Sequence, residues 1–153
     1  MLEEELVAKY GSGWSESPQF PYRCYSAPDQ GLEVRLVIYP GDDHKVLSVF
    51  ASRARICTEV EGPRETFPRF KTSEGLAIGD TREKVIRLYG EPTQELGRSR
   101  GDAVLDPFGL KPISDEIGDT ILRFRPTSHG QSLLFEVYLK EGVVSSLFLS
   151  SYP

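Results

Sequence analysis

Two stretches of the chain, one near the start and one past the middle, share an order of features, and this internal similarity constrains the fold most. The first is "EEELVAKYGSG" and the second is "TREKVIRLYGEP", and each reads as a short helix that ends in Tyr-Gly. At an offset of 79 positions, the pair Tyr10-Gly11 falls on Tyr89-Gly90. A repeated helix ending predicts two copies of one structural unit.

The strands that follow each helix also repeat. The segments "LEVRLVIY" at 32–39 and "LLFEVY" at 133–138 alternate apolar and polar residues, which is typical of half-buried strands. A charged turn and a second β-rich run follow each of them. At an offset of 99, Tyr39 falls on Tyr138, and with one residue deleted in the second turn Phe50 falls on Phe148. We interpret the two halves as a duplication.

The second helix has recognisable signals at both ends. We expect it over about residues 81–89, with Asp80 as the N-cap and Glu83 completing a capping box. Gly90 supplies a C-terminal residue with left-handed backbone, and Pro92 prevents continuation. The glycines before the helix have the wrong spacing for a phosphate loop, and no GK[ST] follows them.

These patterns predict an α+β fold, in which tandem helix–antiparallel-sheet repeats form one continuous curved sheet with the helices on one face. The first repeat covers residues 1–61 and is N-terminally incomplete, because it lacks an equivalent of "GLAIGD". The second covers 62–153, with an inserted loop at about 95–118 that reads as irregular. The two are expected to form one structural unit of about seven or eight strands. The predicted core includes Leu36, Ile38, Phe50, Val85, Phe124, Phe135 and Phe148.

Composition excludes several classes of function. A net charge of −5 and a pI near 5.1 argue against a nucleic-acid surface, which needs clustered Lys and Arg. No apolar run approaches the roughly 18 residues of a membrane span, and the N-terminus lacks the basic and apolar regions of a signal peptide. We expect a soluble chain, and localisation stays open because an export signal could precede this sequence. Cys24 and Cys57 have no CxxC spacing, which argues against zinc and leaves a disulfide and two reduced thiols as alternatives.

No motif for catalysis is present. His44 and His129 fall in hairpin turns, and nothing pairs either of them with a nucleophile and an orienting acid. Paired carboxylates can perform acid–base chemistry, but those of the insertion fit the turns of a surface loop better. They are Asp102, Asp106, Asp115, Glu116 and Asp119. We therefore expect no catalytic residue, no cofactor and no metal site.

The segment "GLAIGDTREKVIRLYGEP", followed by a strand, a hairpin and a last strand, resembles the bacterial β-lactamase inhibitory protein-like superfamily. That superfamily also includes related small outer-membrane assembly lipoproteins. The resemblance covers residues 70–92 and 120–150, and residues 3–60 more weakly. It implies helical segments followed by an antiparallel sheet, and a function in binding other proteins on the concave face of that sheet. No catalytic or contact residue of the family carries over.

We therefore expect a non-catalytic, inhibitor-like module that binds a protein or peptide on the helix-free face of the sheet. The alternatives are a cell-envelope assembly or lipoprotein-type adaptor and, third, a small hydrolase. Exposed Tyr and Arg are enriched at interface hot spots, although both are also ordinary on sheet surfaces. The predicted partner-binding residues, on the outward side of the strands, are Tyr39, Tyr138, Arg35, Arg123 and Glu136. Trp14 is expected to plug the core rather than anchor a partner at its rim.

Overall fold

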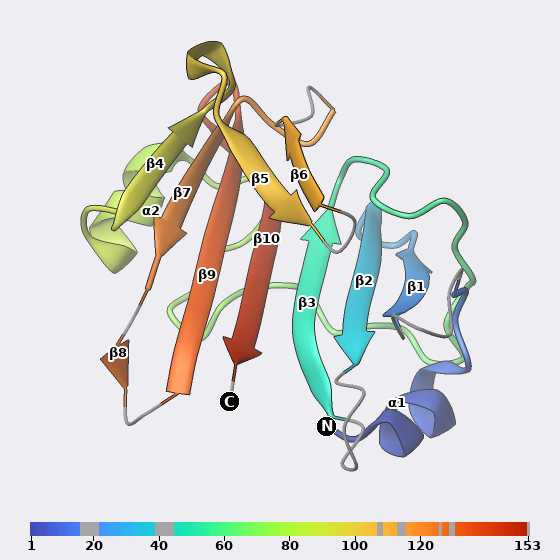
Figure 1. Cartoon of the computed structure of the whole chain (residues 1–153). Coiled ribbons are helices and arrows are strands. Elements are labelled where there is room, and N and C mark those ends of the chain that lie inside the picture. The colour runs from blue at the N-terminus through green and yellow to red at the C-terminus, as the bar shows by residue number, and fades with distance from the viewer. Residues whose placement is uncertain are drawn as a thin grey trace.

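The protein is described from a computed structural model that covers residues 1–15, 22–38, 45–106, 109–112, 116–125, 127–128 and 131–152. It consists of one antiparallel sheet, a separate hairpin, and the helices α1 (Glu3–Tyr10) and α2 (Arg82–Tyr89) (Figure 1). The strands of the sheet are β1 (Tyr22–Ala27), β2 (Leu32–Ile38), β3 (Val46–Ser52), β4 (Gln94–Gly97), β7 (Thr120–Phe124), β8 (Thr127–Ser128), β9 (Gln131–Lys140) and β10 (Val143–Tyr152). The predicted α+β class and the continuous antiparallel sheet are confirmed.

The order of the strands is β1-β2-β3-β10-β9-β7-β4, and β8 pairs with β9 beside this path. The first three strands come from the first half of the chain, and the others from the second. The halves meet where β3 pairs with β10. In that pairing Phe50 lies opposite Phe148, and Ser52 lies opposite Ser146. The middle of the sheet therefore pairs residues of the same type across the boundary between the halves.

Both helices pack on one face of the sheet, which we call the helix face. From α1, Leu6 and Tyr10 join a buried cluster with Leu36 and its neighbours on β2. From α2, Val85 joins a second cluster that includes Phe135 on β9. The register through β3 and β10 places Leu36 and Phe135 on the same side. The helices are therefore on the side that the alternation of the strands predicts.

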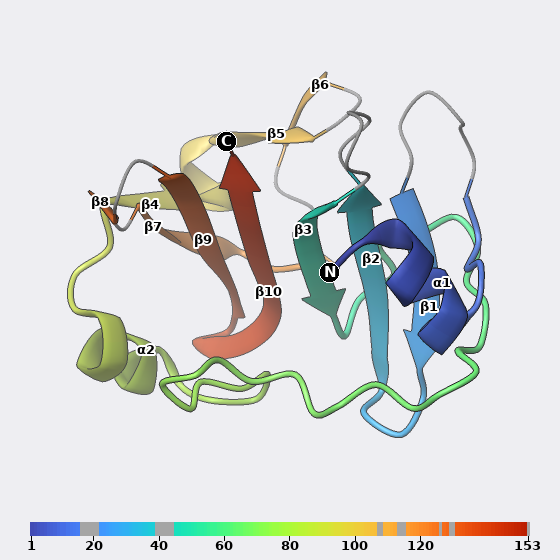
Figure 2. The same cartoon turned by 90° about the horizontal axis from the view of Figure 1, so that it is seen from below.

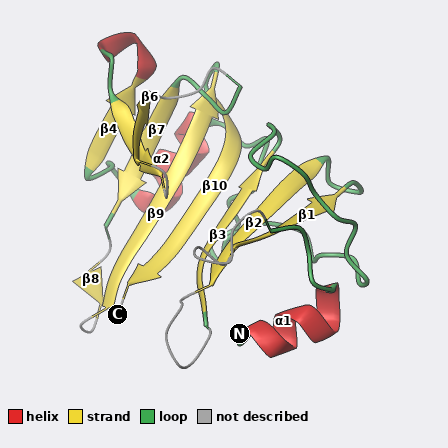
Figure 3. Ribbon diagram, turned by 45° about the vertical axis from the view of Figure 1, so that its right-hand side comes forward, coloured by secondary structure: helices red, strands yellow, loops and turns green. Residues whose placement is uncertain are grey.

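The opposite side, the helix-free face, carries part of the insertion. The insertion contains β4, the short 3₁₀ helix η1 (Arg98–Arg100), and a hairpin of β5 (Ala103–Asp106) and β6 (Gly109–Pro112). Figures 2 and 3 show α2 on one side of the sheet and the β5–β6 hairpin on the other. The expectation of an irregular loop is wrong, because the segment forms the β5–β6 hairpin and adds β4 to the edge of the main sheet beside β7.

The N-terminal end of α2 differs from the prediction by one residue. Thr81 is the N-cap, and its Oγ1 accepts a hydrogen bond from the backbone N–H of Lys84 at 3.3 Å. Asp80 lies just before it, where its carboxylate accepts from the backbone N–H of Ala77 at 2.8 Å. The same carboxylate pairs with Lys84 Nζ at 2.8 Å. Asp80 therefore fixes the turn that leads into the helix instead of capping the helix itself.

The two helices end in the same way. Gly11 and Gly90 have φ angles of 87° and 76°, and their N–H groups donate to Val7 and Ile86 at 2.9 and 2.8 Å. The positive φ is confirmed, but ψ is extended at 176° and −164°, outside the left-handed helical region. This combination of angles is essentially restricted to glycine, which explains why glycine ends both helices.

Most of the predicted core residues are buried, and Phe148 is half-buried. Phe50 and Phe148 pack on the helix-free face, where Phe50 joins a third buried cluster that includes Tyr138. The sheet is thus apolar on both sides near its middle. Among the described residues, no helix is both long and apolar enough to cross a lipid bilayer.

Candidate functional site

A row of side chains crosses the helix-free face at one level of the sheet, and we call it the central row. Successive residues of the row lie directly opposite one another on neighbouring strands, so their side chains emerge on the same face. In order from β1 to β4, the row consists of Cys24, Arg35, Phe50, Phe148, Glu136, Arg123 and Gln94. Three predicted partner-binding residues, Arg35, Arg123 and Glu136, are therefore brought together on one line.

An ion pair forms one part of the central row. Arg123 Nε and Nη2 each lie 2.7 Å from Glu136 Oε2, and Arg123 Nη1 donates to Gln94 Oε1 at 3.0 Å. Glu136 is only 5% exposed. A buried carboxylate needs such a partner because the charged form loses its hydration. The expectation that Glu136 is exposed is wrong, since neighbouring strands and Arg123 enclose it.

Aromatic side chains form the middle of the row. Phe50 and Phe148 contact edge to face, with ring centroids 5.8 Å apart and planes at 88°. Arg35 places its Cζ 5.5 Å from the Phe50 centroid, a cation–π distance, and its Nη1 donates to the carbonyl of Ile56 at 3.3 Å. The sequence places Phe148 in the predicted core, like Phe50, without assigning it to a face of the sheet. Only the register between β3 and β10 shows that it belongs to this row.

Tyr138 lies on the helix-free face, as predicted, but it is 8% exposed and therefore not a surface anchor. Its ring centroid is 5.3 Å from that of Phe50. Ile56 from the loop after β3, and Ile117 from the insertion, pack against the same cluster. Burial, and then the nearby charge of Glu136, raise the pKa of the Tyr138 hydroxyl above its usual range. The predicted exposure of Tyr138 is wrong, because segments remote in sequence cover it.

The structure thus separates the predicted partner-binding residues by their exposure to solvent. Arg35 and Arg123 are half-buried and keep contact with solvent. Tyr138 and Glu136 lie beneath the surface. Tyr39 lies outside the described residues. The paired tyrosines therefore do not form two exposed anchors in the part of the chain that the structure describes.

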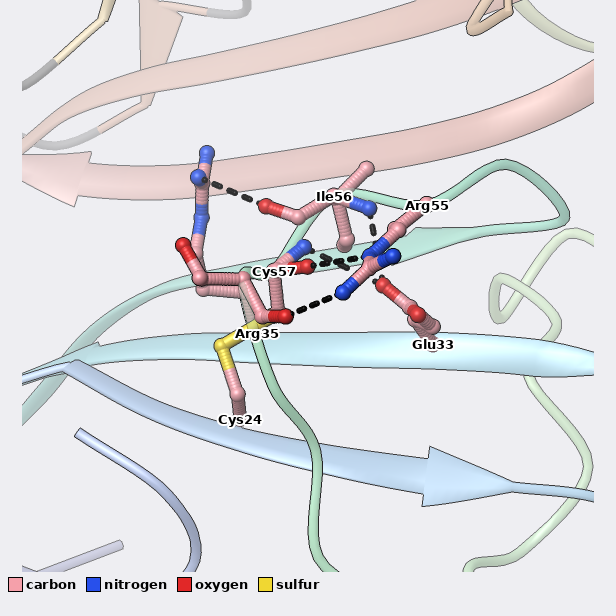
Figure 4. Close-up of a disulfide and its surroundings, with 7 residues drawn as sticks. Cys24, Glu33, Arg35, Arg55, Ile56 and Cys57 are labelled. Carbon is pink, nitrogen blue, oxygen red and sulfur yellow. Dashed lines mark hydrogen bonds between the residues drawn. A yellow bond between two sulfur atoms is a disulfide. The ribbon is translucent and has the colours of Figure 1, made fainter. Parts of the chain in front are cut away.

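A disulfide between Cys24 and Cys57 links the β1 end of the central row to the loop at 53–60, which we call the clamped loop (Figure 4). Of the two alternatives that the sequence leaves open, the disulfide is the one observed. Trp14 exchanges backbone hydrogen bonds with Cys24 at 2.9 and 3.1 Å, and its side chain packs against the cluster around the disulfide. Trp14 therefore covers buried residues, as predicted, but they are the small cluster around the disulfide and not the main core.

Side chains from β2 and from the loop itself hold the clamped loop further. Glu33 Oε2 accepts from the backbone N–H groups of Ile56 at 2.8 Å and Cys57 at 3.1 Å. Arg55 Nε donates to the carbonyl of Cys57 at 3.2 Å. Figure 4 shows these groups converging beside the disulfide. The loop is fixed by one covalent bond and several polar contacts, so its backbone is ordered before any partner binds.

Two of the carboxylates predicted in the insertion accept hydrogen bonds from backbone N–H groups. Asp102 accepts from the backbone N–H of Gly97 at 2.8 Å, and Asp119 accepts from the backbone N–H of Glu141 at 2.9 Å. Asp115 and both histidines lie outside the described residues. Within the described residues, no group of three or more His, Cys, Asp or Glu side chains is placed to hold a metal ion.

In comparisons with known proteins, no family model matches the chain, and neither a curated protein nor a solved structure matches it. The resemblance to the β-lactamase inhibitory protein-like superfamily therefore stays a prediction. Function is inferred from the geometry of the chain itself.

Proposed function

We propose that this chain is a non-catalytic module that binds a protein or peptide on its helix-free face, in the manner of an inhibitor. The central row is the observation that carries the proposal. It aligns Arg35, the pair Phe50–Phe148, and Arg123, and each is already in contact with a neighbour. Arginine and aromatic residues dominate binding hot spots, and side chains that are ordered in advance lose little freedom on binding.

The residues of the row have different parts in this proposal. Phe148 and Arg35 reach solvent and contact the partner directly. Glu136 and Tyr138 form the floor, which keeps Arg123 and the aromatic pair in place. Arg123 offers its remaining N–H donors with its charge already compensated by Glu136. The partner therefore meets an aromatic centre bordered by two guanidinium groups.

The clamped loop provides a rim at one end of the row. The loop exposes Thr58, Glu59 and Val60, while its base is tied to the row through Cys24. A rim that is already ordered adds contacts without the entropy cost of folding a loop on binding. The proposal thus places the binding surface over the central row and this loop together.

The disulfide also bears on where the protein works. Disulfides persist in oxidising compartments and are rare in the cytosol, so the Cys24–Cys57 bond supports a location outside the cytosol. A cell-envelope adaptor, the second candidate, would share this feature. A gene that encodes a lipid-modified cysteine upstream of this sequence would favour the adaptor over a secreted inhibitor.

We further propose that the two halves are tandem repeats of one unit. Both helices have eight residues and the same glycine ending. Phe50 and Phe148 match between the halves in sequence and also pair in space. On either side of them, the pairs Ser48–Ser150 and Ser52–Ser146 exchange with one another when each residue is replaced by its match in the other half. A local two-fold relation about the β3–β10 pair accounts for this register.

The proposal is tested by capturing partners from the native host's lysate and culture medium, and then by measuring their affinity for variants. The double variant Arg35→Ala/Phe148→Ala is expected to bind at least about 30-fold more weakly, because one true hot spot contributes about 2 kcal/mol or more. Arg87→Ala, an exposed position on α2, is the matched control and keeps wild-type affinity. Thermal denaturation of each variant shows that the fold is intact. Wild-type affinity of a folded double variant for every captured partner would refute the site.

A further inference from the structure

A pocket of about 400 Å³ lies on the helix face, where the two halves of the chain meet. Leu32, Phe70 and Ile78 form apolar parts of its lining, and Ile78 packs against the buried clusters of both halves. Volumes of this size are typical of small-molecule sites, which combine apolar walls with a few polar groups. The central row lies on the other face, so the pocket is a separate feature.

The wall formed by the segment before α2 is held in place by one side chain. Gln30 Nε2 donates to the carbonyls of Phe67 and Pro68 at 3.2 and 3.1 Å. Gln30 Oε1 accepts from the backbone N–H of Phe70 at 2.9 Å. With both ends of its amide used, Gln30 keeps Phe70 in place but offers little to a ligand. The polar chemistry of the pocket therefore comes from other residues.

Three charged side chains line the same pocket, namely Arg53, Arg69 and Asp29. Within the part of the chain that the structure describes, none of the three has a hydrogen bond or an ion pair through its side chain. Asp80 interacts electrostatically with Arg69, but its carboxylate is held by Lys84 Nζ at 2.8 Å. Two guanidinium groups and one carboxylate, that of Asp29, thus line this pocket without an ion pair among them, in a chain whose net charge is −5.

The position of Arg53 depends on a glycine. Gly79 has a φ of +100°, and a Cβ built there would lie 2.9 Å from Arg53 Nη2. The backbone N–H of Gly79 donates to the carbonyl of Val144 at 2.8 Å, which ties the turn to β10. The absence of a side chain at residue 79 therefore lets the guanidinium lie close to the backbone at the edge of the pocket.

Charge and shape together indicate the class of ligand. Two arginines and one aspartate give the pocket a net charge of +1, which one singly charged anion neutralises. Guanidinium groups match carboxylates with paired N–H donors, and the apolar walls suit a hydrocarbon or aromatic group. We propose that this pocket binds a monocarboxylate that carries an apolar group, such as the C-terminal residue of a peptide, with the carboxylate held by Arg53 and Arg69. This site is independent of the function proposed for the helix-free face.

The test uses N-acetylphenylalanine as the probe and N-acetylphenylalaninamide, which has the same shape without the charge, as the matched ligand. Binding is followed by NMR titration of the intact chain. The acid is expected to shift the backbone signals of Phe70, Ala77 and Ile78, and the amide to bind at least about tenfold more weakly. Equal binding of the acid and the amide would overturn the proposal.

Variants assign the effect to the pocket. Arg53→Gln/Arg69→Gln is expected to weaken binding of the acid at least about tenfold, whereas Arg87→Gln, an exposed charge change on α2, leaves it unchanged. Asp29→Asn removes a negative charge that repels the carboxylate of the ligand, and it is expected to strengthen binding of the acid. Thermal denaturation confirms that each variant is folded. Unchanged binding in the folded double variant, or tighter binding of inorganic phosphate than of the acid, would overturn the assignment.

Discussion

The disulfide is expected to supply a large part of the stability of the first half of the chain. Cys24 and Cys57 are separated by 33 positions, and a cross-link of that span restricts the unfolded chain. The chain-entropy relation for such a loop gives about 3.7 kcal/mol at 25 °C. For a domain of this size, each kcal/mol corresponds to roughly 2–4 °C, so the melting temperature is expected to fall by about 7–15 °C.

The assay is urea denaturation followed by circular dichroism, on the wild type and on Cys24→Ala/Cys57→Ala. The wild type in reducing agent is the matched control, because it loses the cross-link while it keeps both sulfur atoms in the cluster. The double variant and the reduced wild type should lose a similar free energy of unfolding. A loss below about 1 kcal/mol in both would show that the cross-link does not stabilise the chain to the extent that its loop length predicts.

Two further predictions concern packing and charge. Glu136→Ala leaves the Arg123 guanidinium partly buried without its carboxylate, and the free energy of unfolding should fall by about 3–5 kcal/mol. A double-mutant cycle with Arg123→Ala measures the coupling energy between the two side chains. A coupling energy near zero would contradict the importance of the pair. Gly13→Ala should destabilise more than Gly31→Ala, because both have positive φ but only a Cβ at residue 13 would meet the buried Tyr25 ring, at 2.8 Å. Thermal denaturation compares the two, and equal losses would show that backbone strain alone decides.

The fold could be predicted from the sequence to a large extent because alternation and helix endings are local. Leu36 and Phe135 each lie in an alternating run, and the helices pack on their side of the sheet. The sequence pattern misplaces the capping residue of α2 by one position, because Asp80 and Thr81 are both good N-caps and only the backbone geometry distinguishes them.

The candidate site was predicted less well because it depends on contacts between remote segments. Alternation places Tyr138 on the correct face, but it carries no information about Ile56 and Ile117, which cover it. The run around Phe50 is apolar on both sides of its strand, so its periodicity does not show which face it belongs to. The register of β10 against β3, which depends on pairing between remote segments, is what places Phe148 in the central row.

Binding of a partner on the helix-free face is tested most directly by site-specific cross-linking. A photoreactive phenylalanine analogue is placed at Phe148 in the central row or, as the control, at Arg87 on α2, and each protein is irradiated with the captured partner. An adduct is expected from position 148 and none from position 87. Unlabelled wild-type protein is expected to suppress the adduct by competition. A partner that binds both labelled proteins but forms adducts only from position 87 would contradict binding on the helix-free face.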